Sequence, residues 1–296
     1  MPTLVVILGP TGVGKTELSL QLAQEYGCPI VSADSRQIYR DLPIGTAAPT
    51  AEEQAQVEHY FIACKSLTET YNAGQYARDC KALLSNLFTK HERVVMVGGS
   101  MMYIDAVCNG LDEMPDVPAA IRLEVREAYN QRGLEWLQTE VQRLDPAYWA
   151  EVDQQNPQRL MHCVEICRAT GQPYSSFRKR GATAMERGFD VEYRVVTRPR
   201  EELYERINLR VHKMIEAGLL DEARSAFEQL GISLLPMADD EQAMLPNSLN
   251  TVGYKELLPY FKGEYTLERA IELIQQNSRH YAKRQMTWWR SKGFNF

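Results

Sequence analysis

A short apolar run followed by a glycine-rich loop constrains the fold of this chain more than any other feature. Residues 4–8 (LVVIL) end at Gly9, and residues 9–16 (GPTGVGKT) fit the pattern G-x-x-x-x-G-K-[S/T] in full. An amphipathic segment, residues 17–26, follows, and Gly27 is a typical helix stop. Strand, loop and helix in this order are the context that a phosphate-binding loop requires. The sequence therefore predicts an α/β fold with an anion site after its first strand.

The residue types in this loop suit the binding of phosphate groups. Glycines let successive backbone N–H groups turn towards phosphate oxygens, and the N-terminus of the next helix adds its positive dipole end. Lys15 can reach a terminal phosphate, and the Thr16 hydroxyl suits Mg²⁺. The alternative, a glycine-rich turn that binds nothing, is disfavoured by the completeness of the motif. The residues predicted to bind phosphate are Gly9, Pro10, Thr11, Gly12, Val13, Gly14, Lys15 and Thr16.

The composition is that of a globular protein without a membrane span. The chain has 296 residues, 44% hydrophobic and 24% charged, and its apolar runs are too short to cross a bilayer. Its six scattered cysteines form no C-x-x-C pair, and no candidate signal peptide precedes the first strand. We therefore expect free, mostly buried thiols in the reducing cytoplasm.

Two further strand patterns end in residues suited to a site. Residues 29–33 (PIVSA) lead into Asp34, and residues 93–97 (RVVMV) lead into the turn 98–100 (GGS). Ligands of open α/β sheets bind at this carboxyl edge. We expect Asp34 near the phosphate loop if the first two strands are neighbours. Its alternative role is the N-cap of a short helical turn.

A linker divides the chain into two parts. Residues 110–118 contain two prolines, a glycine and three acids, and strand patterns stop beyond them until residues 191–197. We predict a P-loop NTPase-like α/β core with a parallel sheet, residues 1–115 and 191–296, and a small all-helical insertion domain, residues 116–190. Helical periodicity is expected at residues 72–90, 101–109, 119–131, 134–144, 157–170, 200–216, 221–230 and 266–290.

Basic residues gather in three places although the formal net charge is −6, and one of them is the cluster Arg178, Lys179 and Arg180. Arg206, Arg210 and Lys213 recur along the predicted helix 200–216, where they can clamp a pyrophosphate or form salt bridges with neighbouring glutamates. Residues 273–296 contain no acid, and their cations are interleaved with aromatic side chains. Such a tail can bind phosphate groups of RNA, or it is a solvated helix face above an aromatic anchor formed by Trp288 and Trp289.

The phosphate loop alone leaves the chemistry open. No Asn-Lys-x-Asp motif is present, which argues against a GTPase, and the strand 93–97 ends without the aspartate of an ATPase. A nucleotide or small-molecule kinase with Asp34 as base is compatible with these features. So is an RNA-binding protein without enzymatic activity that retains a relict nucleotide site.

A series of motifs resembles the tRNA dimethylallyltransferase family, in order along nearly the whole chain. The resemblance implies that the loop holds the pyrophosphate of dimethylallyl diphosphate rather than ATP. The dimethylallyl group would move to N6 of adenosine 37, in tRNAs that read codons beginning with U. The motifs are GPTGVGKT (9–16), ADSRQIY (33–39), IGTAAP (44–49), VGGSMMY (97–103), NPQRLMHCVEI (156–166), VGYKEL (252–257) and AKRQMTWWR (282–290).

The resemblance also implies roles for individual residues. Lys15, Thr16 with Mg²⁺, and Arg210 would neutralise the leaving pyrophosphate, while Asp34 would accept a proton from N6. The insertion domain would grip the anticodon stem-loop, and we expect a monomer. The residues implied to contact tRNA are Asp34, Ser35, Arg36, Gln37, Ser100, Arg122, Gln158, Arg159, Leu160, Met161, His162, Gly253, Tyr254, Lys255, Arg279, Lys283, Arg284 and Gln285. Ser100 stands where a threonine is expected, which keeps the hydroxyl, and Asn250 stands where some members carry a basic residue.

Overall fold

The computed structural model describes residues 1–110, 112, 114–178, 184–235 and 245–296, which fall into two compact units. The larger unit is Met1–Cys108 with Thr183–Phe296, and the smaller is Asn109–Ala182. The larger unit contains β1 (Thr3–Leu8), α1 (Lys15–Tyr26), β2 (Ile30–Ser32), α2 (Ala51–Gln56), β3 (His59–Tyr60), α3 (Ala73–Leu87), β4 (Arg93–Val97), α4 (Met101–Asn109), α8 (Ala184–Arg187), β5 (Asp190–Val195), α9 (Arg200–Glu216), α10 (Leu219–Gln229), α11 (Tyr254–Phe261) and α12 (Leu267–Ser291). The smaller unit contains α5 (Ala119–Leu144), α6 (Pro146–Trp149), α7 (Pro157–Thr170) and a 3₁₀ helix (Tyr174–Phe177).

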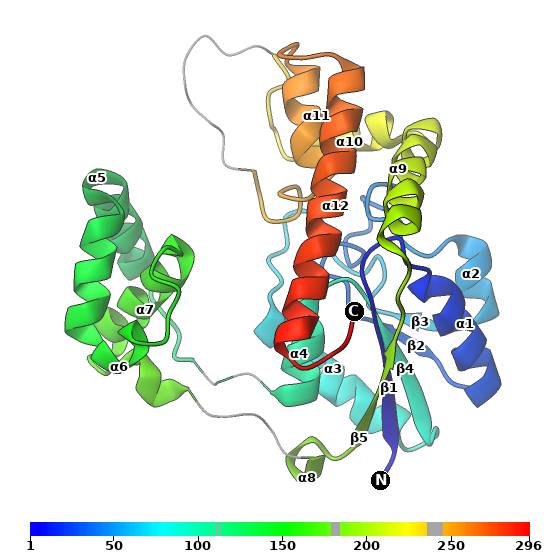
Figure 1. Ribbon diagram of the computed structural model, residues 1–296, viewed down its shortest axis with the longest axis horizontal. Coiled ribbons are helices and arrows are strands. Elements are labelled where there is room, and N and C mark those ends of the chain that lie inside the picture. Colours follow the sequence, from blue (N-terminus) through cyan, green and yellow to red (C-terminus); the bar gives the residue numbers. More distant parts are fainter. Residues whose placement is uncertain (111, 113, 179–183, 236–244) are drawn as a thin grey trace. The chain divides into compact units, whose positions relative to one another are not determined.

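Five parallel strands of the described chain form one sheet in the order β3-β2-β4-β1-β5 (Figure 1). β1 lies between β4 and β5, and its residues from Leu4 to Leu8 are fully buried. A central strand covered on both faces needs apolar side chains on both faces, which explains the unbroken run LVVIL. The predicted parallel α/β core is confirmed.

The first two strands are not neighbours, because β4 lies between β1 and β2, so the condition under which Asp34 was expected near the phosphate loop is not met. Val5 of β1 is in register with Val95 of β4, whose other neighbour is Ile30 of β2. Neighbouring strands lie about 4.8 Å apart, so Asp34 starts two strand spacings from the phosphate loop. The turn that follows β4 lies between these two strands, and its Gly99 N–H contacts the Asp34 carboxylate.

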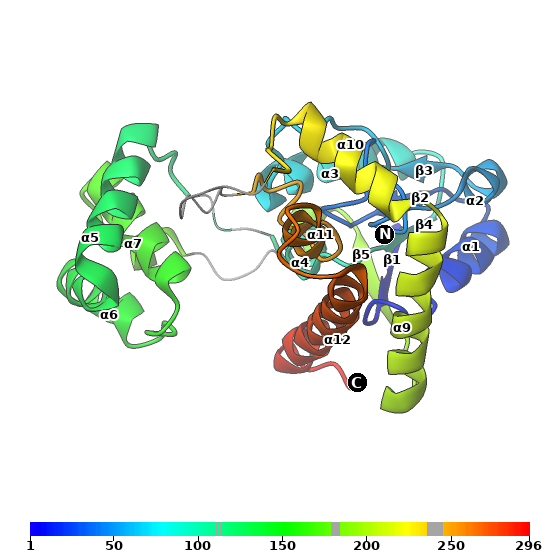
Figure 2. The ribbon, with the colours of Figure 1, turned by 90° about the horizontal axis from the view of Figure 1, so that it is seen from above.

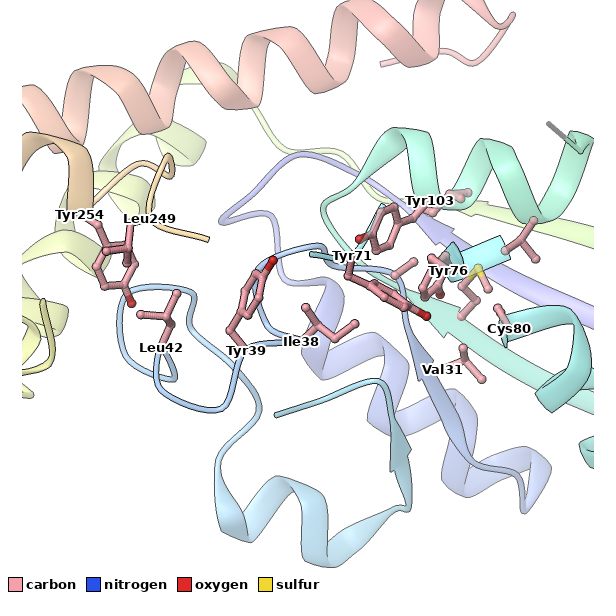
Figure 3. Packing of buried hydrophobic residues seen from close by; sticks show 14 of the residues in the cluster. Val31, Ile38, Tyr39, Leu42, Tyr71, Tyr76, Cys80, Tyr103, Leu249 and Tyr254 are labelled. Atoms are coloured by element: carbon pink, nitrogen blue, oxygen red, sulfur yellow. The ribbon is translucent and has the colours of Figure 1, made fainter. Parts of the chain in front are cut away.

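A pair of stacked tyrosines contacts the end of β2. Figure 3 shows Tyr76 of α3 beside Tyr103 of α4, and their rings stack with centroids 4.2 Å apart. The Tyr76 side chain is fully buried, and its hydroxyl donates a hydrogen bond of 2.9 Å to the carbonyl of Ser32. The last residue of β2 is thereby held two residues before Asp34.

The elements of the larger unit that the sequence analysis did not predict include β3 and α2. β3 is a two-residue edge strand, too short to produce a pattern of its own. α2 has six residues and begins with a capping box, in which Thr50 accepts from the N–H of Glu53 and Glu53 accepts from the N–H of Thr50. The Thr-x-x-Glu spacing was visible in the sequence and would have predicted this helix start.

The smaller unit is helical and has its own hydrophobic core. α5 is interrupted at Gly133, whose φ of 74° and ψ of −169° are not helical, so two helical segments meet where the sequence predicted a break. Asp145 is buried and accepts hydrogen bonds from the N–H groups of Tyr148 and Ser175. The core side chains come from α5, α6 and α7: Val125, Trp136, Leu137, Val141, Tyr148, Leu160, Met161, Cys163, Val164 and Cys167.

Two further sequence expectations concern thiols and membranes. All six cysteines are free, and only Cys64 is exposed, as predicted. No helix within the described ranges is long and apolar enough to span a bilayer.

α9 and α12 are packed against one another (Figures 1 and 2), and the end of α12 is anchored in the core by an aromatic side chain. Trp289 is 4% exposed and meets Phe294 edge to face, with ring centroids 5.8 Å apart. The expectation that Trp288 is an equal anchor needs correction, because its ring is only partly buried. Lys292 stands over that ring at 5.5 Å.

We predict that Trp289→Ala destabilises the larger unit by about 3–5 kcal/mol, since a fully packed indole leaves a cavity when it is removed. Trp288→Ala, the matched control, should cost clearly less because part of that ring already contacts solvent. Urea unfolding followed by circular dichroism measures both. Equal losses for the two variants would show that Trp289 is not the principal anchor.

Candidate active site

The loop between β1 and α1 has the backbone of an anion site. Gly12 and Gly14 have φ angles of 81° and 105°, which residues with a Cβ rarely adopt. A Cβ at Gly12 would also lie 2.9 Å from a side-chain carbon of Ile207 on α9. Because α1 begins at Lys15, its free N–H groups open directly onto the loop. Loop and helix end together favour a bound phosphate.

Lys15 lies across the loop that precedes it. Its Nζ donates hydrogen bonds to the carbonyls of Gly9 at 2.8 Å and Pro10 at 2.9 Å. Burial, and then the nearby charge of Arg210, lower the pKa of Lys15 to about 8, while Asp34 acts in the opposite direction. The ammonium is therefore charged below about pH 8, and an anion bound beside it would raise its pKa again.

Arg210 brings a second, partly buried cation to the same place. It extends from α9, and its guanidinium donates to the Thr11 hydroxyl at 3.3 Å and to the Thr46 carbonyl at 3.5 Å. Burial lowers the pKa of Arg210, and the charge of Asp34 opposes that effect. Two cations and one carboxylate thus share the site, which leaves a net positive charge for an anionic ligand.

The other arginines near the loop support its outer face. Arg206 donates to the Gly12 carbonyl at 2.9 Å, and Arg198 donates to the Val13 carbonyl at 2.8 Å. Within the residues that the structure describes, neither Arg206 nor Arg210 forms the ion pair expected as the alternative for the helix 200–216, and Glu202 pairs with Arg198 instead. Arg198 carries no pattern in the sequence that would have identified it.

Asp34 is held by backbone amides on two sides. One carboxylate oxygen accepts from the N–H of Arg36 at 2.9 Å, and the other accepts from the N–H of Gly99 at 3.2 Å. The first contact caps the turn after β2, which is the alternative N-cap role that the sequence analysis gave for Asp34. The side chain also lines the cavity next to the phosphate loop. Asp34 therefore both caps the turn and lines the site.

The turn after β4 brings Asp34 into position. A Cβ at Gly98 would lie 2.2 Å from the carbonyl of Ala33, so only glycine allows this approach. Ser100 fixes the turn from the other end, since its hydroxyl accepts from the N–H of Ser35 at 2.7 Å and donates to the Ser35 hydroxyl at 2.8 Å. The segments after β2 and β4 are thereby joined at the edge of the sheet.

α12 closes the site with two polar side chains. Tyr281 donates its hydroxyl proton to the Gly99 carbonyl at 2.7 Å. Gln285 donates to the same carbonyl at 2.8 Å and accepts from the Thr11 N–H at 2.8 Å. The C-terminal helix therefore contacts both the phosphate loop and the turn that holds Asp34.

These residues line a cavity of about 840 Å³ in the larger unit. Its polar end carries Lys15, Asp34 and Arg210, while Arg284 also borders it. Apolar side chains complete the lining, and two of them are exposed, Met102 at 47% and Leu209 at 56%. A cavity of this kind suits a ligand that joins an anionic group to an apolar one.

A magnesium ion would depend on its ligand for most of its oxygens. Within the described residues, no cluster of three or more His, Cys, Asp or Glu side chains is arranged for a metal ion. Thr16 is exposed, and it lines the cavity. Mg²⁺ commonly takes one or two protein oxygens and completes its shell with substrate phosphates and water. Thr16 fits that pattern once a phosphate group occupies the loop.

Several candidate RNA-binding residues of the larger unit are already engaged within it. Arg36 donates to the backbone and side chain of Asn247, and Gln37 donates to the Ala47 carbonyl at 2.9 Å. Arg279 donates to the Asn208 side chain at 2.6 Å. Gly253 and Tyr254 are buried, while Lys255 is partly exposed. Lys283 and Arg284 are exposed, so they are the cations of this set most accessible to RNA.

The candidate RNA-binding residues of the smaller unit divide into exposed and buried side chains. Arg122, Gln158, Arg159 and His162 are exposed. Leu160 and Met161 belong to the core of that unit, so their side chains support the surface rather than form it.

Glu222 is a supporting residue that the sequence analysis missed. Its carboxylate accepts from the N–H groups of Ile44 at 2.7 Å and Gly45 at 2.8 Å, and from the Tyr254 hydroxyl at 2.5 Å. The contacts fix the loop whose Thr46 carbonyl receives Arg210. An isolated glutamate on a helix gives no sequence pattern, whereas the motif VGYKEL did include its partner Tyr254.

The comparison with curated proteins gives consistent relatives. The tRNA dimethylallyltransferase 1 of Bacteroides thetaiotaomicron is 50% identical over 290 residues, covering 98% of this chain and 89% of the relative. The tRNA dimethylallyltransferase 2 of Parabacteroides distasonis is also 50% identical over 290 residues, covering 98% and 92%.

Solved structures agree with the sequence relatives. The full-length tRNA isopentenylpyrophosphate transferase of Bacillus halodurans is 33% identical with a TM-score of 0.67, covering 98% of this chain and 87% of that one. A eukaryotic dimethylallyltransferase acting on tRNA, at 24% identity, has a TM-score of 0.79 and covers 97% and 70%, which shows likeness of fold. The model of the IPP transferase family matches residues 37–292. From its sequence relatives and this match, the chain belongs to the IPP transferase family.

Proposed function

We propose that this protein is a tRNA dimethylallyltransferase. It moves the dimethylallyl group from dimethylallyl diphosphate to N6 of adenosine 37, in tRNAs that read codons beginning with U, and releases diphosphate. One observation carries the proposal: Asp34 lines the same cavity as the partly buried cations Lys15 and Arg210. An anionic leaving group and a proton acceptor are the two needs of this reaction, and the relatives named above carry out the same transfer by name.

The donor half of the reaction uses the phosphate loop. The diphosphate would lie against the loop amides, with Lys15 and Arg210 beside it, and their charges would stabilise the negative charge that grows as the allylic C–O bond breaks. Thr16 would hold Mg²⁺ together with the diphosphate, and the ion would supply further charge neutralisation. The apolar lining of the cavity suits the hydrocarbon part of the donor.

The acceptor half uses Asp34. The exocyclic amine of adenine is a weak nucleophile, so a positioned carboxylate that accepts its proton favours attack. A bond forms between N6 and the allylic carbon, the C–O bond to diphosphate breaks, and the proton passes to Asp34. The adenosine must leave its stack to reach a carboxylate inside a cavity.

The tRNA would be held by the exposed cations of both units. Arg122, Arg159 and the segment with Lys283 and Arg284 offer phosphate contacts that set the register of the anticodon stem-loop. The protein would act as a monomer, and the reaction would take place in the cytoplasm with its tRNA substrate.

The choice of donor tests the proposal directly. Calorimetry should show that dimethylallyl diphosphate binds at least about tenfold more tightly than ATP, a difference of about 1.4 kcal/mol. Labelled dimethylallyl diphosphate should then pass its label to tRNA. Tight ATP binding with phosphorylation of a small acceptor would indicate a kinase instead, and tRNA binding without label transfer would leave an RNA-binding protein.

Asp34→Asn should lower the turnover number by on the order of 10²-fold or more, because the amide cannot accept the proton. The affinity for tRNA should change little, since the amide keeps the shape and can still accept from the Arg36 N–H. Asp41→Asn on the same segment is the matched control. Single-turnover label transfer measures the rate, and near wild-type turnover of Asp34→Asn would remove the residue from the catalytic role.

The double variant Lys283→Ala/Arg284→Ala should weaken tRNA binding and flatten its salt dependence, by roughly one unit of log–log slope for each lost phosphate contact. Its melting temperature should hardly change, because exposed charges contribute little to stability. Lys81→Ala/Lys90→Ala lowers the net charge equally on another surface and serves as control. Filter binding across a salt series decides the question. An unchanged slope would show that this part of α12 is a solvated helix face, and the RNA-binding surface would then be sought around the basic cluster 178–180, of which the structure describes Arg178.

A further inference from the structure

Gln285 lies in a segment that the family resemblance assigns to tRNA contact, yet its side chain is 1% exposed. Both ends of its amide are occupied within the protein. The carbonyl oxygen accepts from the Thr11 N–H at 2.8 Å, and the amide nitrogen donates to the Gly99 carbonyl at 2.8 Å. A buried amide whose hydrogen bonds are already made has little left to offer an RNA.

The two partners of Gln285 belong to different halves of the site. Thr11 follows Gly9 and Pro10, whose carbonyls receive the Lys15 ammonium, so it belongs to the part of the loop that places Lys15. Gly99 donates its N–H to the carboxylate of Asp34 at 3.2 Å. The Gln285 side chain therefore links the phosphate loop to the turn that holds Asp34.

The contact at Gly99 is tightly built. Tyr281, one helical turn before Gln285, donates to the same carbonyl at 2.7 Å. A Cβ added at Gly99 would lie 2.8 Å from a carboxylate oxygen of Asp34 and 3.4 Å from the Gln285 amide nitrogen. Gly99 is thus enclosed between Asp34 and α12, and a shift of α12 would move the N–H that holds the carboxylate.

We propose that Gln285 is a positioning residue, which sets the spacing between the phosphate loop and Asp34, and that it does not contact tRNA. The inference rests on the proposed function for its catalytic consequence, but the link to the phosphate loop can be tested without catalysis. The physical reason for a large effect is geometric, since a displacement of about 1 Å between reacting groups can cost on the order of 10²-fold in rate.

The test compares Gln285→Met, which keeps the length of the side chain but makes neither hydrogen bond, with Gln275→Met on the same helix. The Gln275 amide contacts the Asn208 carbonyl and His212, away from the loop and from Gly99. Three quantities are measured for each: the turnover number at saturating donor and tRNA, the dissociation constant for tRNA, and the dissociation constant for inorganic diphosphate by calorimetry.

For Gln285→Met we expect a turnover number lowered by about 10- to 100-fold and diphosphate binding weakened by about 5- to 10-fold, with tRNA affinity within about twofold of wild type. Gln275→Met should leave all three quantities within about twofold of wild type. Weakened tRNA binding with an unchanged turnover number would make Gln285 an RNA contact and overturn the inference. Unchanged values throughout would overturn it as well.

Tyr281→Phe tests the Gly99 contact alone, and it keeps the proposal testable should Gln285→Met not fold. It leaves the Gly99 carbonyl with one donor and does not touch Thr11. We expect a lower turnover number with diphosphate and tRNA affinities unchanged, whereas unchanged turnover would contradict a role of α12 in placing Asp34. If the wild-type protein transfers no dimethylallyl group, the proposed function fails, while the diphosphate affinities of the Gln285 variant still test its link to the loop.

Discussion

Two partly buried cations in one cavity, Lys15 and Arg210, create the constraint on which the rest of the larger unit depends. Burial, and then the charge of Arg210, lower the pKa of Lys15, so the two cations repel each other in the site and burial makes that repulsion more costly. Asp34 and the carbonyls of Gly9, Pro10 and Thr46 offset part of that repulsion. A diphosphate would offset far more of it. The two positive charges therefore favour the binding of an anion. They also explain why the Asp34 carboxylate is tolerated beside the loop.

No single stretch of sequence could hold these charges in place. The phosphate loop lies between β1 and α1, Arg210 comes from α9, and the turn that holds Asp34 is fixed by α12. α9 and α12 also contact each other, so both helices reach the site as one packed layer. The geometry of the site consequently depends on the C-terminal half of the chain as much as on the motif near its beginning.

What the sequence could predict follows from the range of the physical effect involved. The phosphate loop, the buried strands and most of the helix starts are local features, and residues within a few positions of one another predict them. The placement of β4 between β1 and β2 was missed, because strand order depends on packing across the whole sheet. The burial of Gln285 and the support from Glu222 depend on partners more than a hundred residues away. The greater burial of Trp289 than of Trp288 is likewise a matter of which helix face meets the core.

The absence of an aspartate at the end of β4 has a steric cause. Gly98 packs so closely on Ala33 that a Cβ would lie 2.2 Å from its carbonyl, and a Cβ at Gly99 would meet Asp34 at 2.8 Å. A side chain on this turn would separate β2 from β4 at the edge where the site forms. The turn leaves no room for a carboxylate of its own, and it instead supplies an N–H that holds the Asp34 carboxylate, which follows β2. The close packing of Gly98 on Ala33 thus accounts for the missing aspartate that argues against an ATPase. It also lets Asp34 line the cavity beside the phosphate loop, where an acceptor amine could meet the donor.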